Sequence, residues 1–251
     1  FAKAPTPANL NFLFHKSYDI APAELRKTIL TLAIQGKLVP QDPNEEPAEE
    51  LLRMMYSERV ALASEGLLKH TERVEALPDE PSSLHPPQWE LVPLVALCLS
   101  VTDGDHLPPP KSEIGIPFLV ISNVRWGGIN FEGCRHVTEE YFEKLDWTRK
   151  PRAGDILYTL VGSFGIPVLV SDARPFCVQR HIGILRPSNH LDRRYLAYAL
   201  MSDAVFKKAS YIATGIAQKT VPITGLRRIT IPLPPLAEQR RIVAKVGQLM
   251  A

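Results

Sequence analysis

Between residues 154 and 170 the chain reads Gly154-Asp-Ile-Leu-Tyr-Thr-Leu-Val-Gly-Ser-Phe-Gly-Ile-Pro-Val-Leu-Val170. Two apolar runs, Asp155 to Val161 and Pro167 to Val170, flank a short segment with a glycine at each end. Short apolar runs bounded by Gly, Pro, Asp or Asn are typical of β-strands. Glycine permits the backbone to turn between them. This stretch therefore predicts a strand, a turn and a second strand.

Similar runs recur on both sides of this stretch. We predict further strands at Ile116 to Val124, His181 to Leu185 and Arg228 to Ile231. Two windows of helical pattern, Thr138 to Leu145 and Arg193 to Ala209, lie between the strands. Residues 84–232 are therefore expected to form a strand-rich α+β domain with long loops, flanked by helices.

The segment before this domain is predicted to be helical. Apolar residues at helical spacing indicate one helix from about Pro22 to Gln35, and Gly36 supplies its stop. A second helix is expected between Pro47 and Gly66. Prolines and serines between residues 77 and 87 interrupt regular structure, so residues 1–83 are assigned to an N-terminal helical segment.

Residues 233–251 are expected to form a last helix, which begins after two consecutive prolines. Its apolar residues recur at spacings of three and four, the rhythm of a coiled-coil seam, although a helix packed in the core of the domain explains the same pattern. The pattern still runs where the chain stops, which favours a longer coiled-coil-type helix. The expected interface residues, through which a homodimer would also form, are Leu236, Val243, Val246 and Met250.

Charge is distributed unevenly along the chain. The 29 basic and 27 acidic residues give a net charge of +2, too small by itself to indicate a nucleic-acid-binding protein. Residues 1–83 carry 9 basic and 13 acidic side chains, whereas residues 84–232 carry 17 and 13. This asymmetry indicates different partners for different parts of the chain, although solvated surfaces without partners explain it equally well.

The cysteines favour a reducing compartment. Cys98, Cys134 and Cys177 are odd in number and form no Cys-x-x-Cys pair, so neither a disulfide framework nor a ribbon-type zinc site is expected, and the cytoplasm is the predicted location. Cys134 with His136, and Cys177 with His181, lack the spacing of known structural zinc sites. No apolar run reaches the roughly 18 residues that a membrane helix needs.

Catalytic motifs are absent from the sequence. No G-x-x-x-x-G-K-[ST] phosphate loop occurs, and Gly162-Ser-Phe-Gly165 lacks the glycine that precedes the serine in a nucleophile elbow. We find neither the Asn/Asp-Pro-Pro-aromatic motif of adenine methyltransferases nor a convincing nuclease carboxylate cluster. The sequence therefore predicts a non-catalytic protein without catalytic residues, metal or cofactor.

Two long segments resemble a known protein family. Leu25 to Leu52 looks like the leading conserved region of type I restriction-modification specificity subunits, and Ile231 to Val246 looks like the start of their central conserved helix. The short motifs between them resemble, in order, the recurring features of a target recognition domain: Thr102-Asp-Gly-Asp-His106, Ile121-Ser-Asn-Val124, Gly154-Asp-Ile-Leu157, Gly162-Ser-Phe-Gly165 and Gly215-Ile-Ala-Gln218. The chain is thus similar to the amino-terminal half of such a subunit.

The resemblance implies a division of labour. In this family, two target recognition domains are held apart by antiparallel conserved helices, and each reads one half of a bipartite DNA target. The conserved helices dock the modification methyltransferase subunit. The resemblance therefore implies double-stranded DNA, the modification subunit and, in the full complex, the restriction subunit as partners, with methylation and cleavage supplied by those partners.

The body also carries residue types suited to reading DNA. Base reading requires cations for phosphates and hydrogen-bonding side chains for base edges, mounted on loops that a rigid sheet positions. Such residues gather at the ends of the expected strands. The predicted DNA-binding residues are His106, Lys111, Asn123, Arg125, Ser163, Gln179, Arg180, His181, Thr214, Gln218, Lys219 and Thr220.

Structural roles also explain several of these positions. Glycines 162 and 165 fit a plain hairpin turn, and Gln179 and His181 fit structural hydrogen-bond partners. Asp103 and Asp105 are better explained as loop-ordering residues than as base readers, because carboxylates repel phosphate. Trp126 fits a partly buried core or groove-wall aromatic better than a base-stacking residue. The alternative functions are a protein-interaction scaffold that reads no DNA and a zinc-dependent hydrolase.

Overall fold

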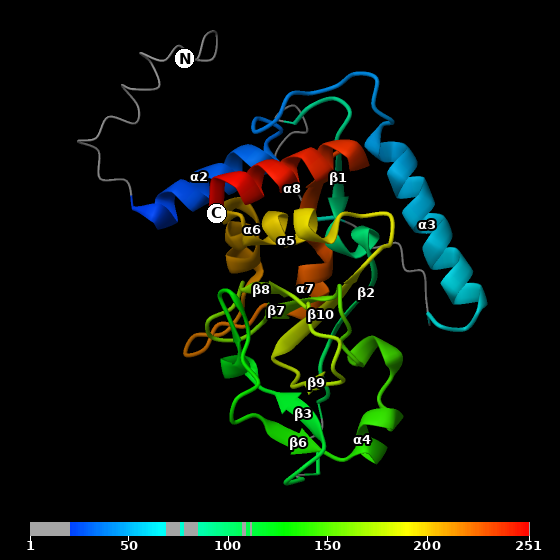
Figure 1. The fold of residues 1–251 in the computed structure, drawn as a ribbon, viewed down its shortest axis with the longest axis vertical. Helices are drawn as coiled ribbons and strands as arrows, with labels where there is room; N and C mark the ends of the chain where they lie inside the picture. Colours follow the sequence, from blue (N-terminus) through cyan, green and yellow to red (C-terminus); the bar gives the residue numbers. More distant parts are fainter. Residues whose placement is uncertain (1–20, 69–75, 78–84, 107–108, 111, 251) are drawn as a thin grey trace.

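The computed structural model describes residues 21–68, 76–77, 85–106, 109–110 and 112–250. A layer of helices lies at one end of the long axis, a small strand-rich lobe lies at the other, and the main sheet lies between them (Figure 1). The helical layer contains α2 (Pro22–Ile34), α5 (Arg193–Met201) and α8 (Leu236–Met250). Helix α3 (Ala48–Ser64) runs along one side of the molecule. The expected α+β architecture is confirmed.

The main sheet has four strands in the order β2-β10-β7-β8, and all neighbours are antiparallel. Strands β7 (Ile156–Thr159) and β8 (Pro167–Leu169) form the predicted strand–turn–strand unit, whereas β2 (Cys98–Asp103) was not predicted. Strands β7 and β10 (Ile182–Pro187) are buried along their whole length because both faces of the sheet are covered.

The lobe is built on a second sheet, β6-β3-β9, formed by β6 (Arg135–Val137), β3 (Ile116–Leu119) and β9 (Cys177–Val178). Strand β3 pairs antiparallel with β6 and parallel with β9. The helix predicted after β6 is confirmed as α4 (Glu139–Lys144), and the Thr138 side chain caps it by accepting the Tyr141 N–H. A 3-10 turn, η4 (Trp147–Arg149), follows.

The strand predicted from Ile116 to Val124 is wrong in its second half. Strand β3 ends at Leu119, and a 3-10 turn, η3 (Ile121–Asn123), separates it from a hairpin of β4 (Val124–Arg125) and β5 (Gly128–Ile129). The Asn123 side chain accepts the Val120 N–H at 2.9 Å. This local bond takes the place of a hydrogen bond to a neighbouring strand, so the chain turns here.

Two strands distant in sequence close the body. Strand β1 (Glu90–Pro93) pairs antiparallel with β11 (Thr230–Leu233), so the beginning and the end of the body lie side by side. The short helices η2 (Leu94–Leu97) and α7 (Ile223–Arg228) border this pair. The sequence did not predict strand β1 or helix α7.

The helix predicted from Arg193 to Ala209 is divided at Ser202. Helix α5 ends there, and α6 (Asp203–Ile212) begins with the Ser202 hydroxyl accepting the Val205 N–H. Ser202 has an extended backbone, with ψ at 149°, so the two helices meet at an angle.

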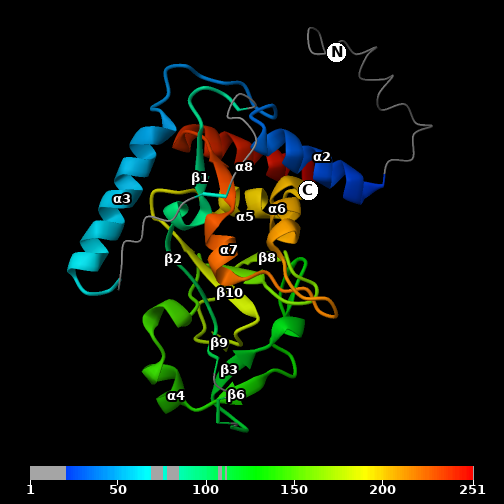
Figure 2. The same cartoon turned by 180° about the vertical axis from the view of Figure 1, so that it is seen from behind.

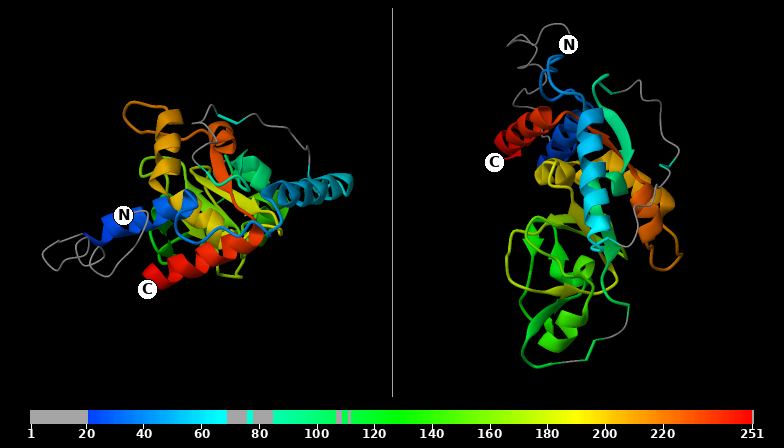
Figure 3. Two further views of the ribbon diagram at one scale, coloured as in Figure 1. Left: turned by 90° about the horizontal axis from the view of Figure 1, so that it is seen from above. Right: turned by 90° about the vertical axis from the view of Figure 1, so that its right-hand side faces the viewer.

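Packing crosses the expected domain boundaries. One hydrophobic cluster joins Leu51 and Met55 of α3 to Leu97 and Tyr158 of the body. Another joins α2 to α8, which lie next to each other (Figures 1, 2 and 3). The division into residues 1–83, 84–232 and 233–251 therefore stays a prediction about roles, because the parts share their cores.

The segment after α2 wraps around the start of α8. Gly36 adopts the left-handed conformation expected of a helix stop, with φ at +69°, and a Cβ there would lie 2.4 Å from Pro86. The buried Glu238 carboxylate accepts hydrogen bonds from Trp89 Nε1 at 2.8 Å and from Gln41 Nε2 at 2.5 Å. In the part of the chain that the structure describes, no helix is long and apolar enough to cross a membrane.

Candidate nucleic-acid interface

The loop after β2 lies against the turn between β9 and β10. The Arg180 N–H donates to the Asp105 carbonyl oxygen at 3.2 Å. A Cβ on Gly104 would lie only 2.0 Å from the Val178 carbonyl oxygen, so the backbones can approach this closely only because residue 104 is glycine. The contact places His106 beside Arg180.

Backbone hydrogen bonds join two further predicted loops to this pair. The Leu160 N–H donates to the His181 carbonyl oxygen, and the Gly162 N–H donates to the Lys219 carbonyl oxygen, each at 2.9 Å. Four loops that are far apart in sequence thus form one continuous edge of the body. We call this edge the loop row and define it as residues 103–106, 160–165, 179–181 and 214–220.

The outer end of the loop row is a narrow hairpin. Thr214 and Thr220 exchange two backbone hydrogen bonds of 2.8 Å, so the residues between them project outward. Gln218 and Lys219 are exposed, and the Gln218 amide nitrogen lies 3.3 Å from the position that a Cβ on Gly162 would take. The exposed Ser163 follows directly in the adjoining turn. Uncharged polar groups and one cation therefore share this end of the loop row.

The inner end of the loop row borders a cavity of about 250 Å³. The cavity is lined by His106, Gln179 and Arg180, all predicted from the sequence, and also by Arg135 and Phe118. Arg135 was missed because β6 was not predicted, so nothing indicated that residue 135 stands opposite Phe118. Two guanidinium groups and an amide can donate hydrogen bonds into this space, which the Asp105 carboxylate also lines.

Two aspartates order the loop that carries His106. Asp103 Oδ2 lies 2.9 Å from His106 Nε2, and Asp105 Oδ1 accepts the His106 N–H at 2.7 Å. Arg149 Nη1 lies 3.3 Å from Asp105 Oδ1, and the Tyr141 hydroxyl donates to Asp105 Oδ2 at 2.5 Å. Burial and the bond to Asp105 raise the pKa of Tyr141, so its hydroxyl remains a donor. The loop-ordering interpretation of both aspartates therefore fits the structure.

His181 occupies the middle of the loop row. Burial lowers its pKa, and the adjacent Arg180 lowers it further, so the imidazole is neutral at physiological pH. Arg180 Nε lies 3.4 Å from His181 Nε2. Within the described part of the loop row, the side chains of Gln179 and His181 form no hydrogen bond with each other, so the pairing considered from the sequence is wrong.

Asn123 does not present its amide to solvent. Its side chain accepts the Val120 N–H and donates to the Asn130 carbonyl oxygen, both at 2.9 Å, and the residue is 8% exposed. The prediction of Asn123 as a DNA-binding residue is therefore wrong, because both ends of its amide are used to hold the β4–β5 hairpin. Its position at the end of a strand could not reveal which way the side chain turns.

Two more predicted residues lie outside the loop row. Arg125 is exposed on the β4–β5 hairpin, where its Nε donates to the Ser122 carbonyl oxygen at 3.0 Å. The neighbouring Trp126 is 63% exposed, so its interpretation as a partly buried core or groove-wall aromatic is wrong. Lys111 lies outside the described residues.

The zinc alternative meets a physical obstacle at Cys177. This residue is 2% exposed, and burial raises the pKa of its thiol to about 12. A protonated thiol is a poor metal ligand. Among the described residues, no group of three or more His, Cys, Asp or Glu side chains is arranged to hold a metal ion.

The predicted seam of the last helix is partly wrong. Val246 is fully buried against α2 and Trp89, and so cannot contact another chain. Leu236, Val243 and Met250 are only partly buried. The core-helix interpretation therefore holds for one face of α8, and a second apolar face remains accessible.

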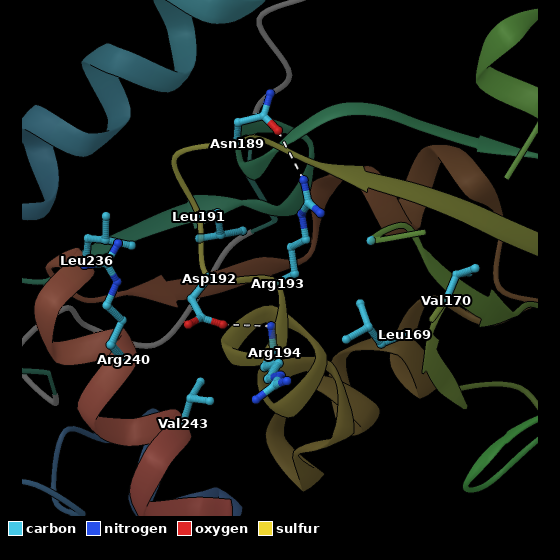
Figure 4. A pocket seen from close by; sticks show the side chains of 11 residues that line it. Leu169, Val170, Asn189, Leu191, Asp192, Arg193, Arg194, Leu236, Arg240 and Val243 are labelled. Carbon is cyan, nitrogen blue, oxygen red and sulfur yellow. Dashed lines mark hydrogen bonds between the residues drawn. The ribbon is translucent and has the colours of Figure 1, made fainter. Parts of the chain in front are cut away.

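This second face borders a groove of about 520 Å³ between α8, the start of α5 and the end of β8 (Figure 4). Arg194 and Arg240 are exposed there and form no ion pair with any described residue. Asp192 Oδ1 accepts the Arg194 N–H at 2.9 Å, and Arg193 Nη2 donates to Asn189 Oδ1 at 3.1 Å (Figure 4). The groove therefore combines apolar side chains with an excess of positive charge.

Comparison with known proteins gives consistent matches. Residues 110–251 match a family model described as the type I restriction modification DNA specificity domain. Over 243 residues the chain is 30% identical to the type I restriction enzyme EcoAI specificity subunit of Escherichia coli, covering 91% of this chain and 39% of that one. For the EcoEI specificity subunit of the same organism the values are 28%, 90% and 39%. The chain thus spans about two fifths of the length of these relatives.

Solved structures show the same fold. The HsdS subunit from Thermoanaerobacter tengcongensis superposes with a TM-score of 0.50 at 20% identity, covering 90% of this chain and 50% of that one. A chain from a study of complex assembly and conformational transition of the type I R-M system gives 0.51 at 20% identity, covering 92% and 52%.

Proposed function

Because the chain belongs to the specificity subunits of type I restriction-modification enzymes, we propose that its loop row contacts double-stranded DNA and reads one half of a bipartite target. In this proposal residues 84–232 are the target recognition domain, and the helices of residues 1–83 and 233–251 support it. The chain itself performs no catalysis. Partner subunits supply methylation and cleavage.

The observation that carries the proposal is the convergence of separate loops. His106, Gln179, Arg180 and Arg135 border one cavity, while Ser163, Gln218 and Lys219 stand at the other end of the same edge. Arginine and glutamine recognise guanine and adenine edges with paired hydrogen bonds, whereas lysine neutralises phosphate as a point charge. The inner end of the loop row thus suits base reading, and the outer end suits backbone contact.

The test compares two substitutions in the chain assembled with its modification partner. Gln179→Ala is expected to relax preference at one base pair, with a loss of about 1–3 kcal/mol of discrimination. Lys219→Ala is expected to weaken binding to all duplexes and to reduce the salt slope by about one. Binding is measured against duplex libraries at several salt concentrations, with the exposed Lys37→Ala as the matched control.

Equal affinity of the assembled wild type for every duplex would contradict sequence reading. Absence of any salt-dependent association would favour the protein-interaction scaffold instead.

The groove beside α8 supports the second part of the proposal, which is that the modification subunit docks on the helical layer. A partner segment with acidic and apolar side chains complements the arginines and the accessible face of α8. In the complete enzyme the restriction subunit joins this assembly. A second copy of the chain is the proposed source of the other half-site reader, and because Leu236 and Val243 line the groove, this copy would meet the chain through Met250 at the end of α8.

A further inference from the structure

Trp126 differs from the other tryptophans of the chain. Trp89 is 6% exposed and its indole N–H donates to Glu238, and the indole N–H of Trp147 donates to the Leu67 carbonyl oxygen. Trp126 is 63% exposed and belongs to none of the hydrophobic clusters found among the described residues. A large indole that is mostly in water and fills no hydrophobic cluster is a candidate contact for another molecule.

The hairpin that carries Trp126 is firmly anchored. Val124 is 2% exposed and packs in one cluster with Ile129 and Val168. Asn123 ties the root of the hairpin to Asn130 in both directions, because its Nδ2 donates to the Asn130 carbonyl oxygen and its own carbonyl oxygen accepts the Asn130 N–H. Little conformational entropy therefore remains to be lost when the tip meets a partner.

The tip is open to a close approach. Gly127 has φ at +94° and Gly128 at +155°, and a Cβ at either position would meet no atom within 4 Å. The neighbouring Arg125 is exposed, and its guanidinium forms no ion pair with a described residue. An aromatic face and a cation thus stand next to each other on a bare turn.

The hairpin starts at the loop row. The Gln179 N–H donates to the carbonyl oxygen of Leu119, the last residue of β3. Trp126 follows Leu119 by seven residues, so their Cα atoms are at most about 25 Å apart. This is less than one turn of duplex DNA, roughly 34 Å. The separation between Gln179 and the tip is therefore within the length of one half-site duplex.

We propose that Trp126 stacks on a base at an opened step beside the half-site, while Arg125 contacts the adjacent phosphate. This inference rests on the proposed function and adds a residue outside the loop row to it. Apolar side chains commonly open a base step in this way, and every base offers a face for stacking. The contact would favour flexible steps, such as TA or CA, at a position that no hydrogen bond reads.

The experiment uses the chain assembled with its modification partner and a target duplex in which 2-aminopurine replaces one base at a time. Wild type is expected to raise the fluorescence at one position, because the base across the opened step from the one that stacks on Trp126 loses its stacking neighbour. Trp126→Ala should abolish this signal and weaken binding by roughly 5- to 150-fold. Trp126→Phe should retain most of the fluorescence signal and most of the affinity. Tyr56→Ala, which removes a 60% exposed aromatic side chain from α3, should change neither the signal nor the affinity.

Each other outcome has a distinct meaning. If Trp126→Ala binds and fluoresces like wild type while Gln179→Ala loses preference, the inference is overturned and the proposed function stands. Weaker binding without any 2-aminopurine signal in wild type would overturn the stacking contact. If wild type binds no duplex, both the inference and the proposed function fail.

Discussion

Asp155 and Arg186 form an ion pair inside the body, where each side chain is 2% exposed. Arg186 Nη2 lies 2.7 Å from Asp155 Oδ2, and the same guanidinium donates to the carbonyl oxygens of Trp147 and Lys150. The pair therefore joins the main sheet to the segment that follows α4. Breaking a buried pair leaves an uncompensated charge in a medium that solvates it poorly.

Asp155→Asn is accordingly expected to lower the free energy of unfolding by about 3–5 kcal/mol. The measurement is the denaturant midpoint, with Asp172→Asn as control. Asp172 pairs with Arg174 at the surface, so its loss should change stability by less than about 1 kcal/mol. If both substitutions changed the free energy of unfolding equally, burial would not determine how much the Asp155–Arg186 pair stabilises the protein.

Glu238 gives a second prediction at the residue scale, which concerns pH. Burial raises the pKa of its carboxyl, and the hydrogen bonds from Trp89 and Gln41 only partly oppose the shift. Because the folded pKa lies above the unfolded one, the folded state binds more protons between them, and this group's contribution to stability falls as pH rises through that window. Glu238→Gln should therefore gain stability relative to wild type as pH rises through that window.

Denaturant unfolding of both proteins at several pH values checks this expectation. A difference between them that stays constant with pH would contradict it.

The sequence identified several polar residues of the candidate site, but it did not show which polar side chains turn into the protein. His106, Gln179 and Arg180, all predicted from the sequence, line one cavity, because each stands in a short loop at the end of a strand, where a side chain can reach solvent. Asn123 and Glu238 have equally polar side chains but face inward, and only tertiary contacts decide this. Arg135 was missed because its strand pairs through residues that carry no periodic signal of their own.

At the scale of elements, the local signals were reliable wherever a capping residue or a proline marks the end. Helix α8 follows two prolines and α4 follows Thr138, as expected. Pairing between distant segments was not predictable, because β1 and β11 are short and recognise each other only when the chain has folded. The division at Ser202 was not predicted, although serine is a good helix cap, because the apolar pattern of the helix continues through this residue.

Ser202→Ala tests the importance of this cap. The Ser202 hydroxyl accepts the Val205 N–H and donates to the Ala199 carbonyl oxygen, so its loss should reduce the free energy of unfolding by about 1 kcal/mol. Ser210→Ala in the same helix is the matched control. Ser210 only bonds back to Phe206, and alanine is the better helix former there, so that variant should be neutral or slightly more stable. Similar losses in both variants would argue against a capping role.

At the scale of the whole molecule, the proposed DNA contact and the proposed docking groove lie apart. The loop row borders the lobe, whereas the groove beside α8 lies in the helical layer (Figures 1 and 4). Substitutions in the groove should therefore impair docking without changing which bases are preferred.

Arg240→Glu is expected to weaken association with the modification subunit at least about tenfold, because it reverses a charge in the proposed contact. Lys245→Glu makes the same charge change at an exposed position of α8 outside the groove lining, and should have little effect. Sedimentation velocity of the mixed subunits measures both. Equal weakening by the two variants would indicate a general effect of charge instead of a groove contact.

The antiparallel pair of β1 and β11 has a consequence for inheritance. The chain enters and leaves the body through neighbouring strands, so two crossover points, one in each strand, would exchange everything between them as a single cassette. A replacement that keeps the apolar residues of η2 would still fit against α3. Under the proposed function, such an exchange would give the chain a new DNA preference by recombination, while the helices proposed to dock the modification subunit stay unchanged.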